Sequence, residues 1–276
     1  MTVPGTSAPT RLGEAAYAAL GVVLDPELDE PITDLGFVRS VATRQTDEGW
    51  TLEVHLRLPT SFCSPNFAYL MASDSKDALR HLVARGEVDH VVVELDDHHD
   101  SDLINAGLAT DAGYVGTFRH EADHDLEDLR RTFQRKAHTA AMERCLTALL
   151  RADASLTEAQ LPEVVLGDLP RDGHTDALLR RRAALDLDVS DEGRVLVDHE
   201  GRSYRPEEVS MQLRRARSTR VSIDGNAHFC RGLLRTRYPD SGADQTDRVD
   251  GAEPPTAGPS PQSTFIPLHQ LKERHP

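Results

Sequence analysis

The sequence predicts an α/β fold of the α+β type, in which a small α-β-β-α-β unit with a three-stranded mixed sheet precedes a mainly helical extension with a short hairpin. Three observations support this. Apolar and polar residues alternate over 52–58, which is the period of a strand with one buried face. Residues 88–95 are rich in β-branched side chains, which favour strands. Apolar residues recur at helical spacing over 65–85 and again over 122–150.

The first three elements of the unit are a helix and two strands. A helix is expected over 11–24, where leucine and alanine recur at helical spacing, and Pro26 ends regular helix. Strands are expected over 38–43 and 50–58. The residues Thr46-Asp47-Glu48-Gly49 between them have the composition of a hairpin turn.

The second helix and the third strand complete the unit. Ser64 is a favoured N-cap residue and Pro65 a favoured first helical residue, so a helix is expected to begin there and to run over 65–85. Gly86 provides its end. The β-branched run over 88–95 then forms the third strand.

The extension is predicted to be helical, with one hairpin. A long helix is expected over 122–150, and Ser155-Leu-Thr-Glu158 resembles a capping box that begins a short helix. Further along we expect a helix, a hairpin with two short arms, and two more helices: 175–184, 194–197 with 202–204, 206–217 and 226–238.

Charge and composition divide the chain into segments. Residues 171–238 carry 14 arginines and 11 acidic residues, whereas the whole chain has a formal net charge of −15. Such a shift marks a boundary between units, or it is chance variation along a solvated surface. Residues 239–262 have the composition of disordered chain. The expected segments are a flexible N-terminus, an α/β domain, a helical connector, a small basic α+β unit and a disordered tail: 1–10, 11–110, 111–170, 171–238 and 239–276.

Composition limits the classes of function. The negative charge argues against binding to nucleic acid or to anionic membranes. We find no apolar run of the length of a membrane span, and the first ten residues lack the features of a secretory signal. Three cysteines lie far apart without a CxxC pair, which is not a disulfide framework. A reducing cytoplasm is therefore the expected location.

Cys63 is the residue at which we most expect chemistry. It follows the second strand and stands just before a helix start, where free amide groups favour a thiolate over a thiol. A thiolate there can attack an electrophile or bind a soft metal. The alternative is that Cys63 is a small apolar filler, as most intracellular cysteines are.

A motif upstream connects Cys63 to a known family. Residues 25–38 read Asp-Pro-Glu-Leu-Asp-Glu-Pro-Ile-Thr-Asp-Leu-Gly-Phe-Val, which gives D-P-E, five steps to an aliphatic residue, and then x-D-L-G-x-V. With these spacings, the α-β-β-α-β order, and Thr60 ahead of Cys63, the chain resembles the metal–sulfur cluster assembly family that includes SufT and PaaD. The resemblance covers about residues 11–110 and leaves the extension unmatched.

The resemblance implies an accessory factor rather than an enzyme. Such a factor helps to insert iron–sulfur clusters or iron into a client metalloprotein, with the Fe–S assembly machinery as a further partner. PaaD-like relatives serve oxygenase systems, so a monooxygenase component is an expected client. One motif cysteine suggests a transient cluster or iron, or a cluster shared between subunits of a homo-oligomer. The alternative is a metal-free assembly chaperone or adapter.

Five further residues are expected to support the pocket of Cys63: Asp25, Asp34, Gly36, Thr60 and Ser64. Asp25 precedes a proline and can cap local amides, and Asp34-Leu35-Gly36 suggests a tight turn. Two interpretations of the carboxylates remain open. They hold this turn only, or one of them lines the pocket and tunes the thiol or binds metal.

The chain departs from the family pattern at two places. Ser64 stands where the family has a proline directly after the cysteine. Residues 96–100 read Asp-Asp-His-His-Asp, where the family commonly has a segment with Pro-Trp.

A second metal site is suggested by the sequence His120-Glu-Ala-Asp-His124. It fits the H-E-x-x-H motif of zinc proteases, with His120 and His124 as ligands and Glu121 as base. Its position at a helix beginning among acidic residues disfavours a metal-dependent hydrolase, because proteases bury this motif in an apolar helix. Together with His98 and His99, these histidines remain candidates for a secondary iron or zinc site.

The other two cysteines lie in expected helices. His228 and Cys230 form an H-x-C pair, which offers a second cluster ligand or packs within an apolar helix. Cys145 is expected in the core.

Overall fold

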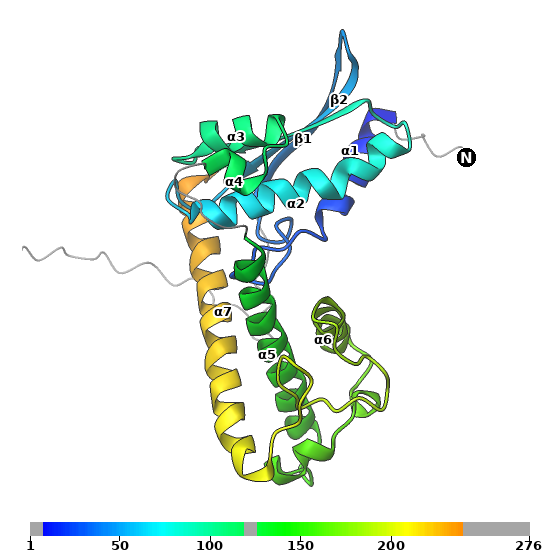
Figure 1. Ribbon diagram of the computed structural model, residues 1–276, viewed down its shortest axis with the longest axis vertical. Helices are drawn as coiled ribbons and strands as arrows, with labels where there is room; N and C mark the ends of the chain where they lie inside the picture. The colour runs from blue at the N-terminus through cyan, green and yellow to red at the C-terminus, as the bar shows by residue number, and fades with distance from the viewer. Residues whose placement is uncertain (1–7, 119–125, 240–276) are drawn as a thin grey trace, which may run out of the picture. The chain divides into compact units, whose positions relative to one another are not determined.

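The computed structural model describes residues 8–118 and 126–239. Its first five elements form the predicted unit, and the fold class is confirmed: α1 (Ala8–Leu20), β1 (Val38–Thr46), β2 (Gly49–Arg57), α2 (Pro65–Ala84) and β3 (His90–Asp96). The sheet is mixed, because β1 pairs antiparallel with β2 and β2 pairs parallel with β3 (Figure 1).

The central strand β2 determines which face of the sheet is buried. Leu52, Val54 and Leu56 are at most 1% exposed, and they alternate with more accessible polar residues. Helix α1 packs on β1 and on α2, and α2 packs on β3, so the two helices cover the sheet together. The apolar residues that alternate along this part of the sequence therefore form the buried face of the sheet.

The parallel pairing of β2 and β3 positions the functional loops. Arg57 at the end of β2 lies opposite Asp96 at the end of β3. Parallel strands have their carboxyl ends at the same sheet edge. The segment after β2, residues 58–64 (the Cys loop), therefore emerges beside the segment after β3, residues 97–100.

Two short helices follow β3 and were not expected: α3 (Ser101–Ala109) and α4 (Gly113–Phe118). Glycine at positions 107, 113 and 116 weakens their intrinsic helix propensity. Tertiary contacts compensate, since Ile104, Leu108 and Phe118 are buried in the core of the α/β unit.

The extension contains three α-helices and three short 3₁₀ helices within the described residues. These are α5 (Glu127–Ala152), η1 (Glu158–Glu163), η2 (Leu166–Asp168), α6 (Gly173–Ala184), η3 (Pro206–Glu208) and α7 (Val209–Arg237). Helices α5 and α7 run antiparallel side by side, and α6 packs on α5 (Figure 1). The capping box of η1 consists of Thr157 and Gln160, two residues later than the pattern beginning at Ser155 predicted.

The predicted hairpin is reduced to one bridge. Among the described residues its arms, 194–197 and 202–204, form no strands, and only Val197 and Ser203 pair. The reason lies in the turn between them. Asp198 Oδ1 accepts the backbone N–H groups of Glu200 and Arg202, so a side chain satisfies donors that a strand ladder would have used.

The two predicted helices at 206–217 and 226–238 are wrong as separate elements. They form the single helix α7, which continues through Gly225. A glycine in a helix interior costs about 1 kcal/mol relative to alanine. Ile223 and Ala227 are buried on either side of it, and their packing offsets this cost.

Helix α7 contributes to two hydrophobic cores. Its Ala227 and Leu234 belong to the core of the α/β unit, whereas Val209 and Ala216 belong to a second core with α5 and α6. The expected boundaries at residues 110 and 170 remain predictions. Within the parts of the chain that the structure describes, no helix is long and apolar enough to cross a membrane.

Candidate functional site

Cys63 lies directly before the N-cap of α2 and is half-buried. Ser64 is the N-cap and Pro65 the first helical residue, as predicted. The Ser64 side chain makes no capping hydrogen bond. Its carbonyl instead accepts the N–H groups of Phe67 and Ala68, so Ser64 supports the site through its backbone.

Thr60 contacts the sulfur of Cys63. Its Oγ1 accepts the N–H of Phe62 at 3.2 Å and lies 3.5 Å from Cys63 Sγ. Because Oγ1 already accepts from the backbone, the hydroxyl proton is available to the sulfur. Thr60 therefore connects the sulfur of Cys63 to the backbone of the Cys loop.

His98 fixes the backbone of Cys63. Its side chain is buried, and its Nδ1 accepts the N–H of Asp100 at 3.1 Å. The ring proton of the neutral imidazole is therefore assigned to Nε2, which donates to the carbonyl oxygen of Cys63 at 2.8 Å. Both ring nitrogens of His98 are thus used to position the Cys loop.

The neighbouring His99 also supports the Cys loop. Its N–H donates to the carbonyl of Ser61 at 2.8 Å, and its ring lies 5.6 Å from that of Phe62, centroid to centroid. The segment at which the chain departs from the family pattern therefore has a structural role here. The adjacent histidines are visible in the sequence, but their position beside the Cys loop depends on the parallel pairing of β2 and β3.

Residues at the end of α7 also form hydrogen bonds with the Cys loop. Arg237 donates to the carbonyl of Leu58 at 3.0 Å, to Ser61 Oγ at 2.7 Å, and to the carbonyl of Asp97. Tyr238 donates to the Asp97 carboxylate at 3.1 Å. One guanidinium thus ties the segments after β2 and β3 together, a contact that no local sequence pattern predicts.

Asp25 organises the residues 25–31, which we call the motif loop. Its Oδ1 accepts the N–H groups of Glu27 and Leu28 at 2.9 and 2.8 Å, and only 7% of the residue is exposed. Burial raises the pKa of this carboxyl to about 6, against the lowering effect of the two amides. Asp25 caps local amides, as predicted, and it does so in a low-polarity environment.

Asp34 and Gly36 lie in the turn between the motif loop and β1. Asp34 is exposed, and its recorded contacts within the described residues are with Thr33 and Tyr17. Gly36 has a φ of +76°, a conformation that glycine adopts at little cost. The turn leads into Phe37, whose carbonyl accepts the N–H of Arg57 at the end of β2.

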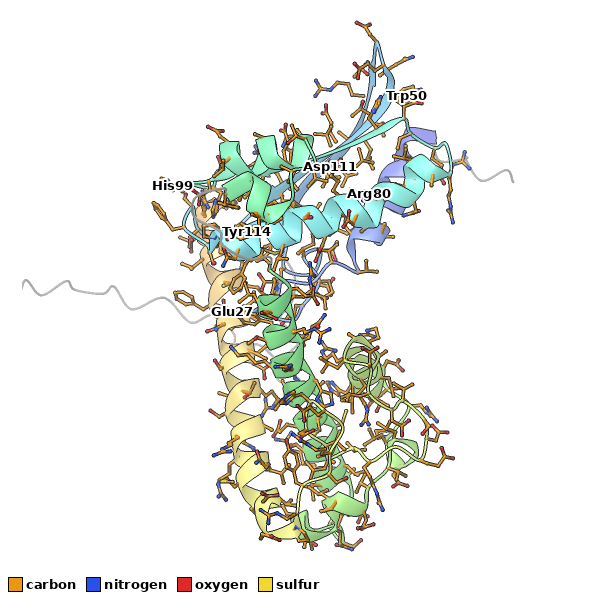
Figure 2. All side chains as sticks on the ribbon, in the orientation of Figure 1. Glu27, Trp50, Arg80, His99, Asp111 and Tyr114 are labelled. Atoms are coloured by element: carbon orange, nitrogen blue, oxygen red, sulfur yellow. The ribbon has the colours of Figure 1, made fainter. Side chains whose placement is uncertain are left out.

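Cys230 lies on α7 near Cys63 and the motif loop. Burial raises the pKa of its thiol to about 11, and the negative charges of Asp25, Cys63 and Glu27 add to the effect. Glu27, which is labelled in Figure 2 and which the sequence analysis did not single out, accepts a hydrogen bond from Asn226 of α7 at 3.2 Å. Glu27 is the glutamate of the D-P-E motif, so the motif could have identified it from the sequence.

Two other residues from the sequence analysis, His228 and Cys145, lie on helices of the extension. His228 is exposed on α7. Cys145 is buried in the second core, as expected, and burial raises the pKa of its thiol to about 11. His120, Glu121 and His124 lie outside the described residues.

A second group of potential ligands lies on the strands of the sheet. One ligand atom each of His55, Glu94 and Asp96 lies within 4.8 Å of the others. Asp96 already accepts hydrogen bonds from Arg39 at 2.6 Å and pairs with His55 Nδ1 at 2.9 Å. A guanidinium on the same carboxylate opposes a cation there, so we interpret this group as an ion-pair cluster.

Comparisons with known proteins agree with the residues described above. The model of a family described as iron–sulfur cluster assembly protein matches residues 13–93. No curated protein matches the chain. A solved structure with some similarity is a domain of unknown function, DUF59, from Bacillus anthracis, which is 22% identical and covers 38% of this chain and 93% of its own, with a TM-score of 0.28. Residues 13–93, which include the D-P-E motif and Cys63, are therefore similar to the iron–sulfur cluster assembly protein family.

Proposed function

We propose that this protein is an accessory factor that delivers iron or an iron–sulfur cluster to a client metalloprotein, with Cys63 as the ligand or transfer thiol. The observation that carries the proposal is the placement of Cys63. Cys63 is half-buried with its sulfur beside the Thr60 hydroxyl, and its backbone is fixed by His98. The match of residues 13–93 to the model of the iron–sulfur cluster assembly family supports the same role.

The chemistry required is ligand exchange rather than turnover of a substrate. A thiolate binds iron firmly, and a half-exposed thiolate remains accessible to the incoming ligands of a client. The protein then acts without being an enzyme, and its iron is cargo. A reducing cytoplasm keeps such a thiol free, and an oxygenase component is our preferred client.

Complementation in cells lacking the protein tests this role. We expect Cys63→Ser to abolish maturation of the client, measured as iron and acid-labile sulfide bound per client molecule. Cys145→Ser is the matched control, because Cys145 is buried in the second core. The thermal midpoint of each variant shows whether it folds. Full client maturation by a folded Cys63→Ser variant would refute the proposal.

A metal-free adapter is the second candidate, and one observation favours it. Phe62, directly beside Cys63 in the sequence, is 79% exposed. Exposure of a large aromatic side chain to water is unfavourable unless a partner covers it. An adapter would use this ring to bind its client. In that case Phe62→Ala would abolish co-purification with the client, while Cys63→Ala would leave both binding and maturation intact.

A further inference from the structure

We propose that the free edge of β3 binds a second copy of this chain, with the two β3 strands antiparallel and Val92 of each copy on the two-fold axis. The strand is complementary to itself in this register, which identifies the second copy as the partner. The inference goes beyond the proposed function and does not depend on Cys63 as a ligand.

The outer side of β3 is open. In the order β1-β2-β3, β3 is an edge strand, and β2 is its strand partner within the described residues. At Leu95 the side chain of Asn105 on α3 takes the place of a second partner strand. It accepts the Leu95 N–H at 2.9 Å and donates to the Leu95 carbonyl at 3.2 Å. Because the peptide groups of successive residues in a strand face alternate sides, those of Val91 and Val93 also face outward.

A groove of about 980 Å³ lies along this edge. Residues 90–94 line it together with residues of α2 and α3. From the described residues, no hydrogen bond is recorded that reaches the outward peptide groups of Val91 and Val93. The strand contains neither lysine nor proline, and Val92 is 39% exposed at its centre. Such an edge is a template for another strand, and it is accessible over residues 90–94.

The sequence of β3 is complementary to itself about Val92. In an antiparallel pair centred there, His90 lies opposite the partner's Glu94, and Glu94 lies opposite the partner's His90. Opposite charges in directly opposed cross-strand positions are favourable, and like charges are unfavourable. Val91 and the partner's Val93 then exchange hydrogen bonds through their outward peptide groups.

Asn105 excludes the neighbouring register. A pair centred on Val93 would place Val91 opposite the partner's Leu95, whose peptide groups already bond to Asn105. The pair centred on Val92 uses only residues 90–94, and it therefore leaves the Asn105 contact intact.

The two charged side chains of this register are accessible to a partner. The side chains of His90 and Glu94 are 49% and 47% exposed, and their ion pairs within the chain are long. His90 Nε2 lies 4.0 Å from Glu48, and His55 Nδ1 lies 3.9 Å from Glu94. By the alternation of a strand, both lie with Val92 on the face of the sheet opposite to buried Val93.

Antiparallel pairing separates the two Cys loops. In each copy the Cys loop emerges where β2 and β3 end. Since the two β3 strands run in opposite directions, the two loops lie at opposite ends of the joined sheet. This interface therefore keeps the two Cys63 residues apart, and under the proposed function each copy carries its own cargo.

Sedimentation velocity of the full, reduced chain measures the association. We expect a monomer–dimer equilibrium between about 10 µM and 1 mM, because the paired segment is short. Val92→Lys places two ammonium groups against each other on the axis and should weaken the dimer about tenfold or more. Val189→Lys is the matched control, since Val189 is 49% exposed and lies in the extension. The thermal midpoint of each variant shows whether it folds.

An exchange of charges tests the register. His90→Glu opposes two carboxylates, and Glu94→Lys removes the attraction to His90, so each variant alone should dimerise more weakly than the wild type. A mixture of the two should form a heterodimer, because the new carboxylate at position 90 then faces the new ammonium at position 94. Two dyes, one on each variant, identify the heterodimer in sedimentation. A mixture that associates no better than either variant alone would overturn the inference.

Val92→Cys tests the position of the axis. Its two copies would form a non-hydrogen-bonded pair with Cα atoms about 4.5 Å apart, within the range of a disulfide. We expect mild oxidation to link the copies through position 92, as identified by mass spectrometry of the linked peptides. His90→Cys is the control, since its two copies would lie about 14 Å apart. Absence of the link through position 92 would contradict the proposed axis.

The oligomeric state decides the inference. A monomeric wild type across the concentration range would overturn it, and so would a dimer that Val92→Lys leaves intact. If the wild type were monomeric and Val92→Lys lost co-purification with the client, the edge would bind a strand of the client and not a second copy. None of these measurements involves Cys63, so the maturation assay decides the proposed function independently.

Discussion

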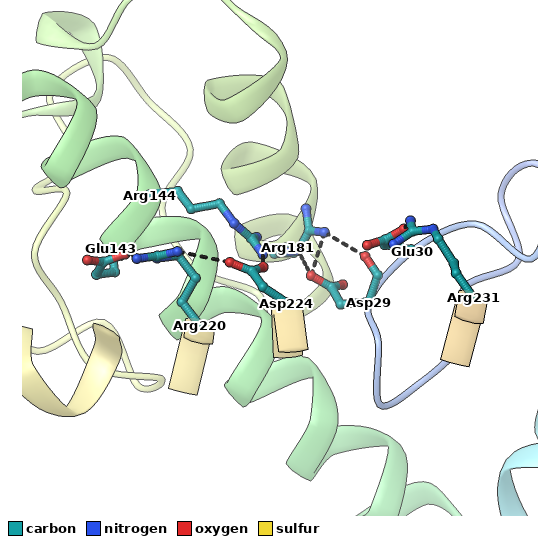
Figure 3. A network of polar contacts seen from close by, with 8 residues as sticks. All are labelled: Asp29, Glu30, Glu143, Arg144, Arg181, Arg220, Asp224 and Arg231. Atoms are coloured by element: carbon teal, nitrogen blue, oxygen red, sulfur yellow. Dashed lines mark hydrogen bonds and ion pairs between the residues drawn. The ribbon is translucent and has the colours of Figure 1, made fainter. Parts of the chain in front are cut away.

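Arg181 of α6 and Asp29 of the motif loop form an ion pair at 2.6 Å, with side chains that are only 14% and 6% exposed. The pair connects positions 152 residues apart and lies in the network of Figure 3. Burial raises the pKa of Asp29 in spite of the attraction of Arg181. Desolvation of this carboxylate therefore outweighs the pairing, and the pair specifies how the loop docks more than it stabilises the fold.

This balance predicts the result of a double-mutant cycle. We expect Arg181→Met to lower the free energy of unfolding by about 3 kcal/mol, because it leaves a buried carboxylate without its partner. Asp29→Asn in the same chain should restore most of the loss. Asparagine tolerates the φ of +57° at this position. Urea denaturation of the four proteins measures the coupling, and additive effects would contradict it.

Loss of the His98 imidazole should destabilise the Cys loop. His98→Ala removes the donor to the Cys63 carbonyl and the acceptor for the Asp100 N–H. The expected cost is about 2 kcal/mol in unfolding free energy, together with reduced client maturation. His99→Ala is the control, since the His99 backbone bond survives the substitution. Equal effects of the two variants would argue against a special role of His98.

Arg237→Lys should loosen the Cys loop while keeping the charge. An ammonium group cannot reproduce the fork that reaches Leu58, Ser61 and Asp97 together. We expect faster amide hydrogen exchange in residues 58–64. Arg235→Lys is the matched control, because the recorded bond of Arg235 is to the carbonyl of Arg231 on its own helix. Unchanged exchange in Arg237→Lys would contradict the expectation.

His138 should make stability depend on pH. Among the described residues neither of its two buried ring nitrogens has a hydrogen-bond partner. Burial, together with the positive charge of Arg182, lowers the pKa of His138 to about 4. The unfolded chain, with a pKa near 6.5, binds the proton more readily, so stability is lost as pH falls from about 6.5 to about 4.

Replacement of His138 by leucine should remove this loss. The advantage of His138→Leu over wild type is expected to grow by up to about 3 kcal/mol between pH 7 and pH 4, measured by urea denaturation at each pH. His174→Ala on the exposed start of α6 is the control. A constant difference between His138→Leu and wild type across this range would refute the expectation.

Local patterns were sufficient to predict the α/β unit. Alternation around Leu52 and the Ser64-Pro65 pair are short-range signals, and both correspond to elements within a residue or two. They also placed Cys63 before the helix start, and the D-P-E motif identified Asp25 as a capping residue.

The contacts that complete the site depend on long-range packing. Arg237 reaches the Cys loop only because α7 continues through Gly225, where burial of neighbouring residues outweighs the local preference for a break. His98 reaches Cys63 because two strands run parallel. Neither relation is encoded by spacing along the chain.

The packing of α7 in two cores has a consequence for chimeras that contain only part of this chain. One helix carries residues that pack in both cores. The same helix carries Asn226, which bonds to the motif loop, and Arg237, which bonds to the Cys loop. A chimera that joined residues 8–118 to an unrelated partner would expose the apolar patch covered by Ala227 and Leu234 and would tend to self-associate. Residues 8–118 therefore depend on α7 to cover part of their apolar surface.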